Sequence, residues 1–224
     1  MDEAKPQDLS VISEIVALVQ VPLLIVGARS LQLYQGPISN FRTTLDWDVA
    51  IAVDSWMTYG GVRRQLINSG RWAADNQSGD HRLRHIPTGA LVDLLPFGQI
   101  CDPRGVLTLP GSRQQLNMAG FEEAFDCATA ITDIERPDLG TIRVATPPAI
   151  AALKFISYSD RPAERVRRDL PDIAHILRQY GKSRWQEDRL YEAEFLLSPG
   201  GLKPANHCRP YIPHWPAPWQ VVFF

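Results

Sequence analysis

Residues 42–53 read RTTLDWDVAIAV, a run of β-branched and aromatic residues that carries two aspartates and predicts a β-strand. Successive side chains of a strand point to opposite faces, so Asp46 and Asp48 share one face and Trp47 takes the other. Two carboxylates at neighbouring positions of one face suit a divalent cation, and Mg²⁺ prefers oxygen ligands of this kind. Because Asp-x-Asp is frequent by chance, its meaning depends on the residues around it.

The composition indicates a cytoplasmic globular protein. The 224 residues are 45% hydrophobic and 21% charged, which fits one soluble domain with a helical addition. A net charge of −2 excludes a protein coated in positive charge but leaves room for a local basic patch. Three scattered cysteines favour a reducing compartment over a disulfide framework or a zinc site. The polar, acidic start is unlike a secretory signal and no segment has the length of a membrane span, so we expect no membrane partner.

Hydrophobic periodicity predicts an α/β (α+β) chain in three parts. Mixed strands and helices are expected in residues 1–145, helices in 146–197, and an irregular tail rich in proline and aromatic residues in 198–224. The expected strands are 22–26, 42–53, 81–86, 90–95 and 141–144, of which 81–86 and 90–95 form a hairpin. The expected helices are 8–18, 28–34, 56–68, 148–158, 163–179 and 183–197.

Gly27 ends the first predicted strand and precedes a predicted helix. A glycine there permits a tight turn and a close approach of the backbone to a ligand. The free N–H groups at a helix start suit a phosphate, and Ser30 can add a hydroxyl. The alternative is an ordinary turn between a strand and a helix.

Asp93 is a third acidic residue of interest because its neighbours, residues 90–95, are otherwise apolar. An unpaired carboxylate in a buried strand is costly, so Asp93 needs a partner. A strand beside the one that carries Asp46 would complete a cluster of three carboxylates for a metal. The alternative is a structural salt bridge with Arg82 or Arg84.

Lys154 lies in a helix that is apolar on nearly every side, so it either reaches the surface or contacts an anion. Asp169 and Asp172 lie on the following helix. With Arg165 and Arg168 they can form an exposed ladder of i,i+4 ion pairs. Alternatively, Asp169 borders the apolar stripe of its helix and points inward.

In order and spacing, these features resemble the AbiEii/AbiGii-type nucleotidyltransferase toxins of the polymerase-β-like nucleotidyltransferase superfamily. The resemblance spans about residues 21–197. It rests on the Gly27-Ala28 turn, Arg42-x-Thr44-x-Asp46-x-Asp48, residues 92–98, residues 120–124, residues 152–154 and Arg168-Asp169-x-x-Asp172. The turn of the family is commonly Gly-Gly or Gly-Ser, where this chain has Gly27-Ala28.

The resemblance implies a mixed-sheet nucleotidyltransferase domain followed by a C-terminal helical bundle. It implies an NTP as substrate and Mg²⁺, or alternatively Mn²⁺, as cofactor. The implied metal ligands are Asp46, Asp48 and Asp93, and the implied nucleotide-binding residues are Gly27, Ala28, Ser30, Thr44 and Lys154. The implied catalytic set is Asp46, Asp48, Asp93, Lys154 and Asp169.

The acceptor that the resemblance implies is a hydroxyl of RNA, including tRNA, or of a protein. The chain would then be the toxin of a toxin–antitoxin or phage-defence pair, with a cognate antitoxin as partner. A small-molecule acceptor such as an aminoglycoside is the first alternative. The second is a catalytically silent binding module with the same fold.

Overall fold

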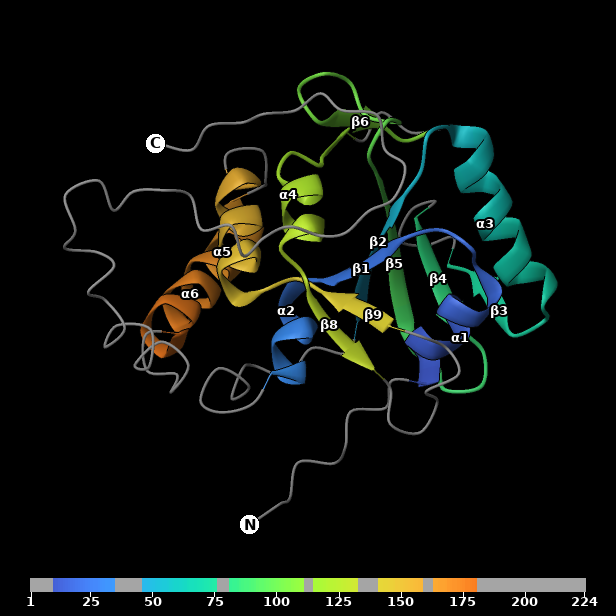
Figure 1. The fold of residues 1–224 in the computed structure, drawn as a ribbon, viewed down its shortest axis with the longest axis horizontal. Helices are drawn as coiled ribbons and strands as arrows, with labels where there is room; N and C mark the ends of the chain where they lie inside the picture. The colour runs from blue at the N-terminus through green and yellow to red at the C-terminus, as the bar shows by residue number, and fades with distance from the viewer. Residues whose placement is uncertain are drawn as a thin grey trace, which may run out of the picture.

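The computed structural model describes residues 10–34, 46–75, 81–110, 115–132, 141–158 and 163–180 (Figure 1). Thr44, the predicted helix 183–197 and the predicted tail 198–224 lie outside the described residues. Within the described part of the chain, no helix is both long and apolar enough to cross a membrane.

A seven-stranded mixed sheet forms the centre of the fold, which confirms the α/β class (Figure 1). Its order is β3-β4-β5-β2-β1-β9-β8. The pairs β1·β9 and β2·β5 are parallel, and the other neighbours are antiparallel. The strands are β1 Leu23–Val26, β2 Trp47–Ala52, β3 Trp72–Ala74, β4 Arg82–His85, β5 Leu91–Phe97, β8 Thr129–Thr132 and β9 Thr141–Val144. A separate two-stranded sheet pairs β6 Val106–Thr108 with β7 Gln115–Asn117.

The described helices pack around this sheet. They are α1 Ser10–Leu18, α2 Gly27–Ser30, α3 Trp56–Asn68, α4 Phe121–Asp126, α5 Pro147–Ile156 and α6 Ala163–Tyr180. A 3₁₀ turn, η1 Leu31–Leu33, continues α2. Side-chain caps fix the starts of α3 and α5. The Ser55 hydroxyl accepts from Thr58 N at the start of α3, and the Thr146 hydroxyl accepts from Ala149 N at the start of α5.

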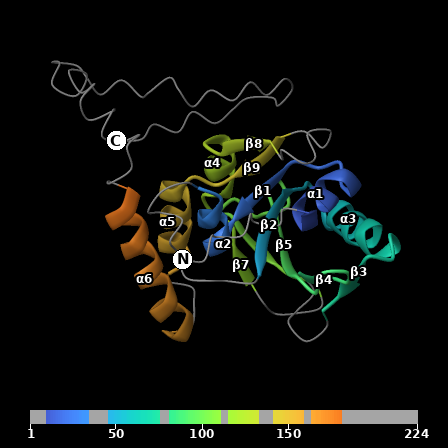
Figure 2. The ribbon, with the colours of Figure 1, turned by 90° about the horizontal axis from the view of Figure 1, so that it is seen from below.

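The two faces of the sheet bury different helices, which lie on opposite sides of it in Figure 2. Trp47, Val49 and Ile51 of β2 pack with α1 and α3. Ala50 of β2 packs with residues of α4, α5 and α6. Because strand side chains alternate, Asp48 shares the face of Ala50.

Most of the predicted elements are present. The strands predicted at 22–26 and 141–144, the 81–95 hairpin and the helix 56–68 match β1, β9, β4·β5 and α3. The strand predicted at 42–53 is β2, and Asp46 immediately precedes it. The helix predicted at 28–34 begins at Gly27 and changes to a 3₁₀ turn. The strands β3, β6, β7 and β8 and the short helix α4 are not among the predicted elements. β3, β6 and β7 have only three residues, which are too few to show a period.

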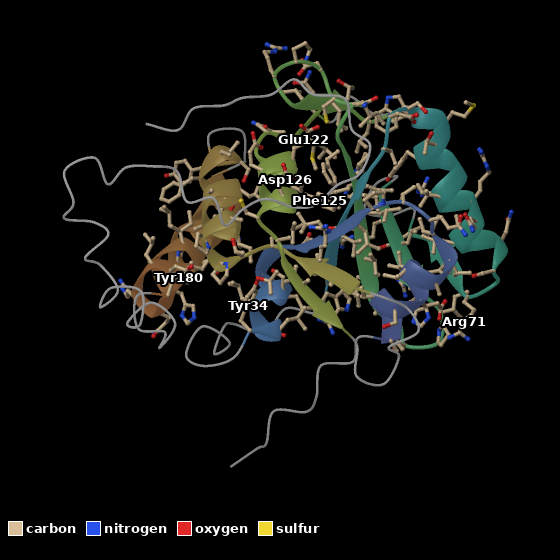
Figure 3. The ribbon with its side chains drawn as sticks, viewed as in Figure 1. Tyr34, Arg71, Glu122, Phe125, Asp126 and Tyr180 are labelled. Carbon is tan, nitrogen blue, oxygen red and sulfur yellow. The ribbon has the colours of Figure 1, made fainter. Side chains whose placement is uncertain are left out.

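Glu14 of α1 connects that helix to the β3–β4 edge of the sheet. Its carboxylate accepts from Arg71 Nε at 2.8 Å and from Trp72 Nε1 at 2.8 Å, and it lies 3.2 Å from Nε2 of the buried His85. Burial is the largest single influence on the pKa of Glu14 and raises it, but the hydrogen bonds from Arg71, Trp72 and His85 together outweigh burial and lower that pKa below its ordinary value. Figure 3 labels Arg71 at this corner.

A pH-dependent loss of stability is expected from this arrangement. A carboxyl whose pKa is depressed by folding stabilises the folded state above its unfolded pKa, and that contribution is lost as pH falls through the folded pKa. Glu14→Gln should therefore reduce the free energy of unfolding at neutral pH, and the gap to the wild type should shrink below pH 4.5. Urea denaturation at a series of pH values measures this, with Glu123→Gln on α4 as a control. A gap that is constant with pH would contradict the assignment.

Candidate functional site

Gly27 and Asp48 are in close contact at the turn between β1 and α2. Gly27 has φ of +76°, which favours glycine. A Cβ built at Gly27 would lie 1.9 Å from Asp48 Oδ2, so no side chain fits here while Asp48 keeps its position. Gly27 is therefore both the turn residue that the sequence predicts and the residue against which the Asp48 carboxylate packs.

A row of register partners crosses four adjacent strands at this level of the sheet. Val26 of β1 pairs with Asp48 of β2, Asp48 pairs with Asp93 of β5, and Asp93 pairs with Arg82 of β4. Partners in register project to the same face, so Asp48, Asp93 and Arg82 lie side by side. The prediction that the Asp93 strand neighbours the Asp48 strand is confirmed.

The start of α5 joins this edge of the sheet. β9 runs parallel to β1, with Ile25 opposite Val144, and Ala145 N donates to Ile25 O at 2.9 Å. The ends of β1 and β9 are therefore neighbours, and α2 and α5 both begin beside the Gly27 turn. Lys154 lies about two turns into α5.

Arg82 is the cation of the Asp93 cluster. Its Nε donates to Asp93 Oδ1 at 2.6 Å and its Nη2 donates to Asp93 Oδ2 at 2.8 Å, while Nη2 also lies 3.5 Å from Asp46 Oδ2. His81 Nε2 is 3.9 Å from Asp93 Oδ1. The hydrogen bond with Asp93 is the main cause that raises the pKa of Arg82 above its ordinary value; burial opposes this rise, and the charges of Asp93, Asp46 and Asp75 add to it. The structure thus shows the salt-bridge alternative for Asp93, with Arg82 as its partner.

This arrangement bears directly on the predicted metal site. Among the described residues, no group of three or more His, Cys, Asp or Glu side chains is arranged to hold a metal ion. Asp46 and Asp93 do lie together, but the Arg82 guanidinium occupies the place between them and takes both oxygens of Asp93. A three-carboxylate metal set therefore does not fit while Arg82 is in this position. Asp46 and Asp48, on either side of Trp47, are the carboxylates that would hold a cation.

Three of the residues predicted to bind nucleotide, Gly27, Ala28 and Ser30, lie in α2 at the turn that follows β1. Ser30 is fully buried, and its hydroxyl donates to Gly27 O at 2.7 Å, so it stabilises the turn. Ala28 is buried as the second residue of α2. Thr44 lies outside the described residues. The nucleotide-binding role of these residues stays a prediction.

Lys154, Asp169 and Asp172 form a second, buried charge cluster between α5 and α6. Lys154 Nζ donates to Asp169 Oδ1 at 2.7 Å and to Asp172 Oδ2 at 2.9 Å. All three residues are at most 8% exposed. The inward orientation of Asp169 is confirmed, and the exposed ladder considered for Asp169 and Asp172 is wrong. Lys154 does contact an anion, and in the structure that anion is the pair of carboxylates; its predicted phosphate contact stays a prediction.

Three residues of these clusters were not among the predicted site residues: His81, Arg82 and Asp172. The sequence offers Arg82 as a salt-bridge partner of Asp93, and the signal for it is the predicted hairpin of residues 81–95. The register of that hairpin, with Arg84 opposite Leu91, decides that Arg82 rather than Arg84 meets Asp93. For Asp172 the signal is its i,i+3 spacing from Asp169, which places both on one side of α6.

Comparison with solved structures finds distant likenesses. An antigenic nucleotidyltransferase-like protein from Paracoccidioides brasiliensis is similar over 75% of this chain and 72% of that chain, with 16% sequence identity and a TM-score of 0.44. No protein-family model matches the chain. No curated protein sequence matches it either.

The contact between Gly27 and Asp48 predicts an unusually damaging glycine substitution. Gly27→Ala should lower the free energy of unfolding by about 1–2 kcal/mol for the positive φ alone, and further because of the collision with Asp48. Gly70→Ala is the matched control, because Gly70 has φ of +74° and nothing within 4 Å of its added Cβ. Urea denaturation measures both, and equal losses would show that Asp48 does not rest on Gly27.

The same contact can be tested with a double variant. Asp48→Ala removes the carboxylate that a Cβ at Gly27 would strike. The cost of Gly27→Ala should therefore be smaller in an Asp48→Ala background than in the wild type. Additive costs would contradict the contact.

The buried Lys154 cluster predicts a large stability change. Lys154→Met keeps the length of the side chain but removes the cation between two buried carboxylates, which should cost about 3–5 kcal/mol. Adding Asp169→Asn and Asp172→Asn should recover much of the loss, because no buried charge then lacks its lysine. Urea denaturation of the single and triple variants measures this, and a single-variant loss below about 1 kcal/mol would contradict a cluster that is shielded from water.

Proposed function

We propose that this chain is a nucleotidyltransferase that moves an NMP from an NTP to a hydroxyl group and releases pyrophosphate. The observation that carries the proposal is the Asp48 carboxylate, which rests on the Gly27 turn and lies beside Asp93 on the neighbouring parallel strand. A ligand at this edge of the sheet could approach the backbone of Gly27 directly, because Gly27 has no side chain. It would also meet the carboxylates of Asp48 and Asp93 on two neighbouring strands. This is the combination on which the motif resemblance depends.

The proposed roles combine the motif resemblance with the positions of the side chains. Asp46 and Asp48 would hold Mg²⁺ or Mn²⁺, which neutralises charge on a triphosphate when it is bound. The Gly27 turn leaves space for phosphate close to the backbone. Asp93, the third acidic residue, lies between Asp48 and Arg82.

Lys154 and Asp169 are proposed to support the site from the helical side. The helix α5 begins beside the Gly27 turn and carries Lys154 into the space between α5 and α6. Contact with a phosphate would require Lys154 to exchange one carboxylate partner for a phosphate oxygen.

For the acceptor, we propose a hydroxyl of RNA, including tRNA, or of a protein. We further propose that the chain acts in the cytoplasm as the toxin of a toxin–antitoxin or phage-defence pair, with an antitoxin as its partner. Both proposals rest on the motif resemblance. A small-molecule acceptor such as an aminoglycoside is tested in the same experiment.

A catalytically silent binding module is the second candidate. The observation that favours it is the bidentate Arg82–Asp93 pair, which occupies the carboxylate that would complete a three-acid site. Such a module would keep the fold without transferring a nucleotide.

The transfer experiment separates these candidates. Purified chain with Mg²⁺ and each α-labelled NTP should label tRNA, total RNA, a protein fraction or an aminoglycoside. Asp48→Asn should reduce the rate on the order of 100-fold or more, the scale expected when several kcal/mol of charge stabilisation are lost. Asp126→Asn, on α4, is a control that should retain the wild-type rate.

Two outcomes would contradict transfer at this site. The first is labelling by Asp48→Asn at the wild-type rate, with circular dichroism unchanged. The second is no labelling of any acceptor by the wild type. In that case, nucleotide binding measured by calorimetry would indicate a binding module.

A further inference from the structure

Arg82 is a cation in contact with two of the carboxylates of the candidate site. The guanidinium contacts Asp93 through two hydrogen bonds of 2.6 and 2.8 Å and lies 3.5 Å from Asp46. It therefore touches two of the three carboxylates predicted to bind metal. A planar guanidinium with two parallel donors matches the geometry of a carboxylate, and it stays charged at any physiological pH.

The Arg82–Asp93 pair is largely buried. The side chain of Asp93 is 15% exposed and that of Arg82 is 20% exposed. Their pairing is fixed by the backbone, because Arg82 and Asp93 are register partners of β4 and β5. Moving Arg82 away would leave a largely buried carboxylate without its cation, which is costly.

A divalent cation ligated by Asp93 would lie next to this guanidinium. The positive charges of the cation and of the guanidinium would repel each other strongly in this partly buried site. Asp93 cannot therefore be a full metal ligand and the partner of Arg82 together. Asp46 differs from Asp93, because it faces Arg82 through one oxygen at 3.5 Å and its side chain is 38% exposed, so it can turn an oxygen to a divalent cation beside Asp48.

We propose that Arg82 is the resident cation of this site, held by Asp93 in place of a second metal ion. The site then accepts at most one divalent cation, and Asp46 and Asp48 are its ligands. Asp93 is a positioning residue that anchors Arg82. The choice of a divalent cation rests on the proposed function, but the test measures only the binding of the cation.

The test is the number of Mn²⁺ ions bound by nucleotide-free protein, measured by electron paramagnetic resonance of the free ion. Arg82→Met should bind one Mn²⁺ more than the wild type, because Asp93 is then available as a ligand. Arg84→Met is the matched control, since Arg84 lies two residues along the same strand and is exposed. It should bind the same number of ions as the wild type, and so should Arg82→Lys, which keeps the charge.

A second readout is the thermal unfolding midpoint with EDTA and with Mn²⁺. Arg82→Met should unfold at a lower temperature than the wild type in EDTA, and Mn²⁺ should raise its midpoint by more than it raises that of the wild type or Arg84→Met. This readout separates a metal that replaces the cation from a variant that has only lost a structural salt bridge.

The proposal is overturned if the wild type binds two Mn²⁺ ions, a result that needs no variant to fold. It is also overturned if Arg82→Met binds the same number of ions as the wild type. Neither measurement uses an NTP or an acceptor. A failure of nucleotidyl transfer with the predicted gain of an ion would therefore refute the proposed function and leave this inference standing.

Discussion

The register of β2 between β1 and β5 is the constraint on which the rest of the structure depends. It places Asp48 opposite Val26, next to the Gly27 turn, and opposite Asp93 on the other side. A slip of one residue would turn Asp48 toward the face that buries Trp47, Val49 and Ile51. The large side chains of Trp47, Val49 and Ile51 thus take one face of β2, and the carboxylate of Asp48 points to the other.

The sheet also explains why distant parts of the sequence meet at one edge. β1 and β9 are parallel, so the turns that follow them lie at the same edge and start α2 and α5. Asp48 is near the beginning of β2, which is antiparallel to β1, and therefore lies at that edge as well. The charged residues of the Arg82 cluster lie on the sheet, whereas those of the Lys154 cluster lie between helices.

Both clusters obey the same physical rule with different chemistry. A carboxylate withdrawn from water needs a cation or hydrogen-bond donors. Asp93 obtains two directed donors from the guanidinium of Arg82, which fixes its orientation. Asp169 and Asp172 share the ammonium of Lys154, which acts as a point charge and joins α5 to α6. The first cluster orients side chains at a candidate site, and the second fixes the packing of two helices.

The sequence by itself determined the class of the fold, most of the longer elements and the polar residues that need a partner. Periodicity is a local property, so α3, β1, the β4·β5 hairpin and the capped start of α5 could be predicted from neighbouring residues. Only the tertiary structure decided which partner each charge took. Arg82 rather than Arg84 meets Asp93 because the hairpin pairs Arg82 with Asp93, and Lys154 meets Asp169 and Asp172 because α5 and α6 pack together. Such pairings depend on strand register and helix packing, which are set by the whole core and are not written in any single stretch of the chain.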